Sequence, residues 1–161
     1  MNAGVSAGQG GAGIFQRPTL SHESASSILQ AVLGRTHQQD GIPVGVACAI
    51  VGSFGELIAF GAQDSCGALP RKLAARKAYT ALILRRPTAE VKEAAAAGQI
   101  DLDRLNDPEL TPTLGGAPLF INGVIVGAIG ISGLPPSGDA AVAEKAAAEF
   151  NATVTEPAAS H

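Results

Sequence analysis

Two segments of the chain are built of apolar residues in the alternating order of β-hairpins. In "VGVACAIV", residues 44–51, larger side chains fall on one face and glycine or alanine on the other. The turn "GSFGE" and the run "ELIAF", residues 56–60, complete a predicted hairpin. "LGGAPLFINGVIVGAIGISG", residues 114–133, predicts a second one, because Asn122-Gly123 favours a two-residue turn. Each hairpin therefore has a bulky face and a nearly flat face.

The clearest helical period lies in residues 69–85, "LPRKLAARKAYTALILR". Small apolar side chains recur there at 3.6-residue spacing, which predicts that this side packs against the sheet. Capping residues and glycines indicate three more helices. They run from Thr19 or Ser21 to Gly34 or Gly41, from Thr88 to Gly98, and through "AAVAEKAAAEF", residues 140–150.

The order of the predicted elements is helix, two strands, two helices, two strands and helix. Adjacent hairpins favour an α+β fold with an antiparallel sheet and helices mainly on one side, because parallel winding would alternate strands with helices. We expect one domain over residues 18–151. A glycine-rich segment, residues 1–17, is expected to be disordered, and residues 152–161 are expected to form a flexible tail.

Composition narrows the classes of function. The chain has 161 residues, of which 46% are hydrophobic, and a formal net charge of −3 without a long run of Lys or Arg, so we expect no nucleic-acid partner. No apolar stretch approaches the roughly 18 residues that span a bilayer, and no signal peptide is evident, so we expect a cytoplasmic protein without a membrane partner. The helix at 69–85 is apolar on more than one side, which favours a homo-oligomer.

Four cations lie at the start of the helix at 69–85, where they oppose the helix dipole. They are Arg71, Lys72, Arg76 and Lys77. One interpretation is a pocket in which they hold a carboxylate, such as a haem propionate or an organic acid. The other is a solvated face that makes a salt bridge to a second subunit. Arg71 is the strongest candidate for a ligand contact, because it is turned toward the apolar side.

Few other residues mark chemistry. Asp64, Cys66 and Tyr79 are the candidates for catalysis, although their spacing identifies none of them as a general base. His22 and His37 are the candidates for a haem-iron ligand, with a place on the surface as the alternative. No histidine pairs with another at ligand spacing, so we expect no metal site within one chain.

Three blocks carry a family resemblance: "GIPVGVACAIVGSFGELIAF", "ARKAYTALILRRPT" and "LGGAPLFINGVIVGAIGISG". They resemble the GlcG/HbpS-like family, also called the haem-degrading domain family, which includes the C-terminal domain of PduO-type proteins. The resemblance implies a profilin-like layered fold, homo-oligomers from tetramer to octamer, and haem binding or slow haem degradation in some members. The family's motif positions correspond to Lys77, Ala78, Thr88, Gly115, Gly116, Pro118, Ser132 and Gly133.

The chain departs from the family in two places. Its last helix keeps only Asp139 of the usual opening element, and the segment at 63–72 differs from the usual loop. The ligand preference could therefore differ from that of the haem-binding members.

The leading hypothesis is an oligomeric protein that binds a small anionic molecule, with haem as the named candidate. The expected ligand contacts are Arg71, Arg76, Lys77, Gly115, Gly116 and Pro118. One alternative is an isomerase, lyase or hydrolase of small organic acid catabolism, with the same cations and with backbone amides near Gly115 and Gly116 at a developing oxyanion. Another is a non-catalytic partner of a catabolic enzyme.

Overall fold

The computed structural model describes residues 13–155. Most of the predicted elements are present, together with a small hairpin at residues 38–43 and a short 3-10 helix that the sequence patterns did not predict. In chain order the elements are α1 (His22–Leu33), β1 (Gln38–Gln39), β2 (Ile42–Pro43), β3 (Ala47–Gly52), β4 (Leu57–Ala62), α2 (Ala68–Leu84), α3 (Thr88–Ala96), η1 (Asp103–Leu105), β5 (Gly116–Ile121), β6 (Val124–Ser132) and α4 (Pro136–Thr155).

The main sheet has four antiparallel strands in the order β4-β3-β6-β5. The two predicted hairpins, β3–β4 and β5–β6, are joined through β3 and β6, which lie at the centre. The Asn122-Gly123 turn is confirmed, and both residues have positive φ angles of 49° and 76°. The sheet therefore has two edges, β4 and β5.

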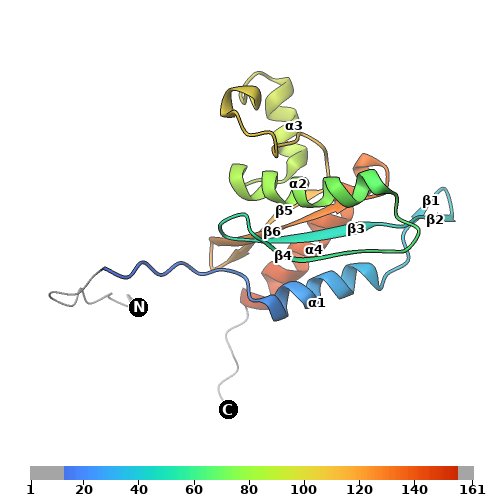
Figure 1. Ribbon diagram of the computed structural model, residues 1–161, viewed down its shortest axis with the longest axis horizontal. Coiled ribbons are helices and arrows are strands. Elements are labelled where there is room, and N and C mark those ends of the chain that lie inside the picture. Colours follow the sequence, from blue (N-terminus) through green and yellow to red (C-terminus); the bar gives the residue numbers. More distant parts are fainter. Residues whose placement is uncertain (1–12, 156–161) are drawn as a thin grey trace, which may run out of the picture.

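The α+β class with an antiparallel sheet is confirmed, but the helices cover both faces rather than mainly one. Figure 1 shows α2 above the sheet and α1 and α4 below it. The bulky face, which includes Cys48 and Ile50, packs against α1 and α4. The flat face, which includes Ala47 and Ala49, packs against α2. Because both faces are apolar, a layer on one side alone would leave the other face in contact with water.

Small residues let α2 approach the sheet closely. A Cβ atom added at Gly130 of β6 would fall on the backbone oxygen of Ala74 and 2.7 Å from the amide nitrogen of Ala78. The predicted alanine stripe of α2 accordingly faces the sheet, and Ala74, Ala78 and Ala81 are fully buried. The backbone of α2 thus lies almost in contact with the backbone of β6.

The helix ends refine the sequence boundaries. Ser21 is the N-cap of α1 and its side chain accepts a hydrogen bond from the Ser24 amide. Helix α4 continues to Thr155 and so includes the first four residues of the segment 152–161 that was expected to be a tail. The expected disordered segment, residues 1–17, lies outside the described residues up to residue 12.

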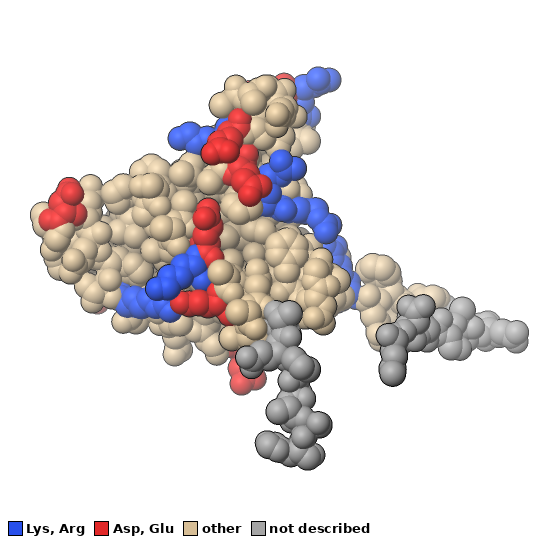
Figure 2. All heavy atoms as spheres, turned by 180° about the vertical axis from the view of Figure 1, so that it is seen from behind, with Lys and Arg blue, Asp and Glu red and all other residues tan. Residues whose placement is uncertain are grey.

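The surface is mixed in charge. On the face that Figure 2 shows, acidic and basic side chains lie close together among broad uncharged areas. Within residues 13–155, none of the helices combines the length and the apolar character that crossing a membrane requires.

Candidate functional site

The basic residues at the start of α2 do not form one cluster. Lys77 points into the protein and is 1% exposed. Arg71 and Lys72 lie on the surface, and Arg76 is half-buried. The basic residues therefore fall into two groups, a buried one at Lys77 and a surface one at Arg71, Lys72 and Arg76.

Lys77 is the centre of a buried polar cluster that joins α2, β6 and α4. Its Nζ donates to the backbone oxygen of Ile131 at 2.9 Å, to Oγ of Ser132 at 3.1 Å and to Oδ2 of Asp139 at 2.8 Å. The other carboxylate oxygen of Asp139 accepts from the Leu134 amide. All three ammonium protons have partners, so Lys77 has none left for a ligand.

Burial acts against the charged forms of this pair. It lowers the pKa of Lys77 and raises the pKa of Asp139, while the hydrogen bond between them opposes both shifts. Burial therefore favours the neutral forms of both groups, and the short hydrogen bond between them favours the charged forms.

Gly115 and Gly116 pack against the same cluster. A Cβ at Gly115 would lie 3.1 Å from Lys77 Nζ, and one at Gly116 would fall on the backbone oxygen of Lys77. The amide of Gly116 donates to Oγ1 of Thr88 at 2.9 Å. This N–H group is therefore already used and is not available to stabilise an oxyanion. Pro118 lies on the far edge of the sheet and lines a different hollow, between α4 and Pro87.

Arg71 and Arg76 line a groove beside α2, which we call the α2–β4 groove. Its volume is about 450 Å³. Its lining residues are Leu57, Phe60, Arg71, Lys72, Ala75, Arg76 and Glu109.

The groove exists because α2 packs mainly on β6, β3 and β5 and leaves most of the α2-facing side of β4 uncovered. Two large apolar side chains of β4 therefore remain accessible, with Leu57 56% and Phe60 42% exposed. Three cations of α2 and one carboxylate border them. The groove thus combines an apolar floor with a positive wall.

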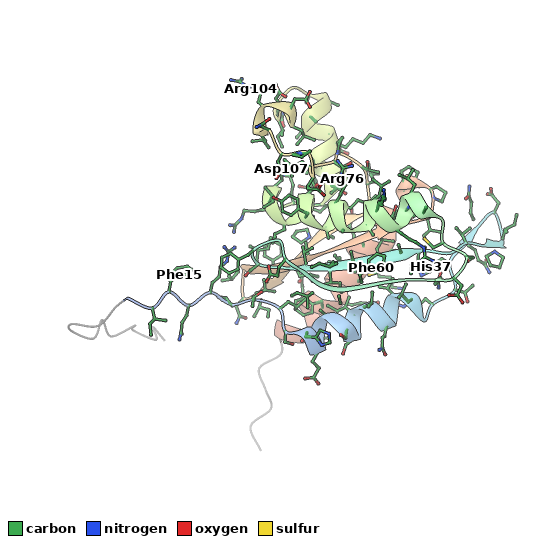
Figure 3. The ribbon with its side chains drawn as sticks, in the orientation of Figure 1. Phe15, His37, Phe60, Arg76, Arg104 and Asp107 are labelled. Carbon is green, nitrogen blue, oxygen red and sulfur yellow. The ribbon has the colours of Figure 1, made fainter. Side chains whose placement is uncertain are left out.

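Arg76 and Tyr79 of α2 hold the loop that brings Glu109 to the groove. The Arg76 guanidinium donates to the backbone oxygens of Pro108, Glu109 and Leu110. Tyr79 donates to Oδ2 of Asp107 at 2.8 Å, and Figure 3 shows Asp107 in the segment that passes above α2. These carbonyls are neutral, so the positive charge of Arg76 is not compensated by them.

The structure does not gather the three candidate catalytic residues around one cavity. Asp64 is exposed and lines a hollow beside His37. Cys66 is buried, its thiol donates weakly to the Gly67 oxygen, and burial raises its pKa. Tyr79 donates a hydrogen bond to Asp107, and its ring lies beside Gly55 in the turn between β3 and β4.

The two candidate iron ligands lie away from the α2–β4 groove. His22 is exposed at the first residue of α1. His37 is buried, and its Nε2 donates to the backbone oxygen of Val32 at 3.0 Å. His37 lines a hollow of about 460 Å³ whose other walls include Arg35, Gln63 and Asp64.

A further hollow, between α1 and α4, was not predicted from the sequence. Its apolar walls include Ile28, Val32 and Phe150, and its volume is about 420 Å³. The ion pair of Arg35 with Glu149, 2.9 Å long, lies at its rim. The apolar stripes of the two helices could have indicated it, but only once both helices were known to share one face of the sheet.

The comparisons with known proteins agree with one another. The profile of the haem-degrading HbpS-like proteins matches residues 20–148. The GlcG protein of Escherichia coli K12 is 33% identical over 113 residues, which cover 70% of this chain and 81% of GlcG.

Two crystal structures have the same fold. HbpS of Streptomyces reticuli, as a double mutant, superposes with a TM-score of 0.75 at 26% identity and covers 92% of this chain and 99% of HbpS. The PduOC:haem complex superposes with a TM-score of 0.71 at 25% identity and covers 83% of this chain and 96% of PduOC.

Proposed function

This chain belongs to the HbpS-like family of haem-degrading proteins, and we propose that it binds a flat anionic molecule, with haem as the leading candidate, in the α2–β4 groove. The observation that carries the proposal is the pairing, in one groove, of exposed Leu57 and Phe60 with the cations of α2. The similarity to a protein crystallised with haem supports the choice of ligand.

The groove suits the two parts of a porphyrin differently. Leu57, Phe60 and Ala75 offer an apolar surface to the ring, and an aromatic side chain stacks well on a flat π-system. Arg71 and Lys72 offer positive charge to the carboxylates, and Arg71 spends only two of its nitrogens, Nε and one Nη, on the backbone oxygens of Cys66 and Gln63. Glu109 contributes one negative charge to the groove against the three positive charges of α2, so the wall keeps an excess of positive charge.

Among the residues that the structure describes, those that line the groove include no imidazole and no thiol. The proposal therefore concerns recognition of the ring and its carboxylates by this chain, without a ligand to the iron from the groove itself. Degradation of haem remains a prediction from the family.

The experiment is a titration of the purified protein with hemin, followed at the Soret band. We expect saturable binding that Arg71→Gln/Lys72→Gln weakens roughly tenfold to a hundredfold, as the loss of charge-assisted hydrogen bonds predicts. The matched control is Arg86→Gln/Lys92→Gln, which removes two exposed cations away from the groove and should leave the affinity unchanged. Equal affinity for the two double variants would contradict the proposal.

Two further probes separate the chemical parts of the ligand. Iron-free protoporphyrin IX should bind about as well as hemin, because the groove offers no iron ligand. Its dimethyl ester, which has no free carboxylates, should bind more weakly and should not distinguish the Arg71→Gln/Lys72→Gln variant from the unmodified protein.

A further inference from the structure

The two edge strands of the main sheet, β5 and β4, differ in whether their outward backbone N–H groups have hydrogen-bond partners. In an antiparallel sheet, alternate residues of an edge strand turn their N–H and C=O groups away from the sheet. In β5 the residues that face outward are Gly116, Pro118 and Phe120. The Gly115 oxygen accepts from the Ile131 amide of β6, so the alternate residues Ala117 and Leu119 also direct their backbone groups toward β6.

None of the outward positions of β5 has a free backbone N–H group. The Gly116 amide donates to Oγ1 of Thr88, and the Phe120 amide donates to Oδ1 of Asn151, both at 2.9 Å. Pro118, between them, has no N–H. This edge therefore has no free donor with which to pair with another strand.

The edge at β4 is open. The amide of Gln63 donates to the Val46 oxygen, so Gly61 and Ala59 also face β3, and the amides of Phe60 and Ala62 face outward. Among the described residues no side chain closes these two positions. The strand "LIAFGA", residues 57–62, also contains no proline and no charged residue of the kind that protects an exposed edge.

We infer that β4 is a surface for pairing with a second copy of this chain, antiparallel to its own β4. A second copy fits because a strand paired with itself across a two-fold axis presents the same open donors and acceptors from both sides. The exposed Leu57 and Phe60 would lose water on pairing, which favours association.

Pairing at β4 completes the α2–β4 groove, and this step rests on the proposed function. Because β4 is an edge strand of the sheet, α2 forms a wall on one side of the groove and, within residues 13–155, no strand lies beyond β4 on the other side. In the paired sheet the two α2 helices lie on the same face, so the two grooves merge above a floor made of both β4 strands. The merged groove takes one flat anionic ligand for two chains.

The charges link the ligand to the pairing. Each copy brings Arg71, Lys72 and Arg76 to the shared groove against one Glu109, so the two walls repel each other when no anion lies between them. An anionic ligand that binds only the paired form stabilises that form by mass action. Hemin should therefore raise the fraction of paired chains.

Cysteine cross-linking tests the pairing surface. In a Cys48→Ser/Cys66→Ser background, Phe60→Cys, Ala62→Cys and the double variant are oxidised with copper phenanthroline. We expect a disulfide-linked dimer from at least one of them, and none from Phe120→Cys, which places the same change at an outward position of β5. Circular dichroism confirms that each variant is folded. The oxidation is run with and without hemin, and no dimer from any folded β4 variant under either condition would overturn the inference.

A Soret titration of the unmodified protein, at chain concentrations well above the Kd for hemin, tests the shared groove. A break at one hemin for two chains supports it, and a break at one hemin per chain overturns it. If β4 cross-links but hemin does not bind, the proposed function and the shared groove fail while pairing at β4 stands.

Discussion

The Nζ atom of Lys77 lies 2.8 Å from Oδ2 of Asp139, and both side chains are almost completely buried, with 1% and 4% of their surfaces exposed. The two residues are 62 positions apart in the chain. Their ion pair joins the start of α4 to the middle of α2, next to the end of β6. This buried contact therefore links a helix on one face of the sheet to a helix on the other.

Replacement of Lys77 should destabilise the protein strongly. Lys77→Met leaves Asp139 buried without its partner, which costs about 3–5 kcal/mol in comparable sites. Urea unfolding followed by circular dichroism measures the loss. The control is Lys92→Met on α3, where the side chain is exposed and the change should stay within about 0.5 kcal/mol. A loss below about 1 kcal/mol for Lys77→Met would show that the pair is not a structural anchor.

A methyl group at Gly130 should separate α2 from the sheet. The new Cβ would meet backbone atoms of Ala74 and Ala78, which cannot move without the helix. We expect Gly130→Ala to cost about 1–3 kcal/mol, the usual range for overpacking. Gly67→Ala is the control, because its Cβ would lie 3.7 Å from Pro70 Cδ. Thermal melts that coincide for the two variants would contradict the close contact.

Tyr79 should titrate above its ordinary pKa. The hydrogen bond to Asp107, together with burial and the charge of that carboxylate, raises the pKa of Tyr79 above 10.0. Because Tyr79 is the only tyrosine and the chain has no tryptophan, absorbance near 295 nm reports this residue alone. Asp107→Asn should shift the midpoint down toward 10.0, and an unchanged midpoint would mean that the hydrogen bond does not form.

The same shift predicts the pH dependence of stability. The folded state holds the phenol proton more tightly than the unfolded state, so the contribution of Tyr79 is complete below pH 10 and is lost as the pH rises through the folded pKa. The difference in unfolding free energy between the unmodified protein and Tyr79→Phe should therefore shrink above pH 10. A difference that grows there would reverse the sign of the argument.

Cys48 should be unreactive in the folded protein. It lies in the centre of β3 with no exposed surface, and burial raises its pKa to about 12. At pH 8 only about one thiol in ten thousand is then ionised, and the thiolate is the reactive form. Iodoacetamide labelling followed by mass spectrometry should modify Cys48 only after denaturation. Labelling of Cys48 at the same rate in the folded and denatured protein would contradict its buried position.

Local pattern predicted the hairpins, the helix at 69–85 and the two unequal faces of β3, since each depends on residues close in sequence. The helical period also placed Lys77 with the polar residues of that helix. The structure buries Lys77 because Asp139 and Ser132 reach it from distant elements. No spacing within the helix could have shown this, although the family resemblance had singled out all three residues.

The α2–β4 groove depends on strand order, which the sequence patterns did not determine. Arg71 and Arg76 were predicted as ligand residues from their charge at the start of the helix and, for Arg71, from its position toward the apolar side. The contribution of Leu57 and Phe60 follows only from the position of β4 at the edge of the sheet, where α2 does not cover it. The local sequence offered only the presence of two large apolar residues, Leu57 and Phe60, in the short predicted strand at 56–60.

The most direct test of the central claim is to map the ligand onto the protein by backbone amide NMR, with diamagnetic gallium protoporphyrin IX as the probe. We predict that the amides with the largest shift changes lie in β4, at residues 71–76 of α2 and near Glu109. Changes confined to the hollow between α1 and α4, or to the surroundings of His37, would place the ligand elsewhere and contradict the account.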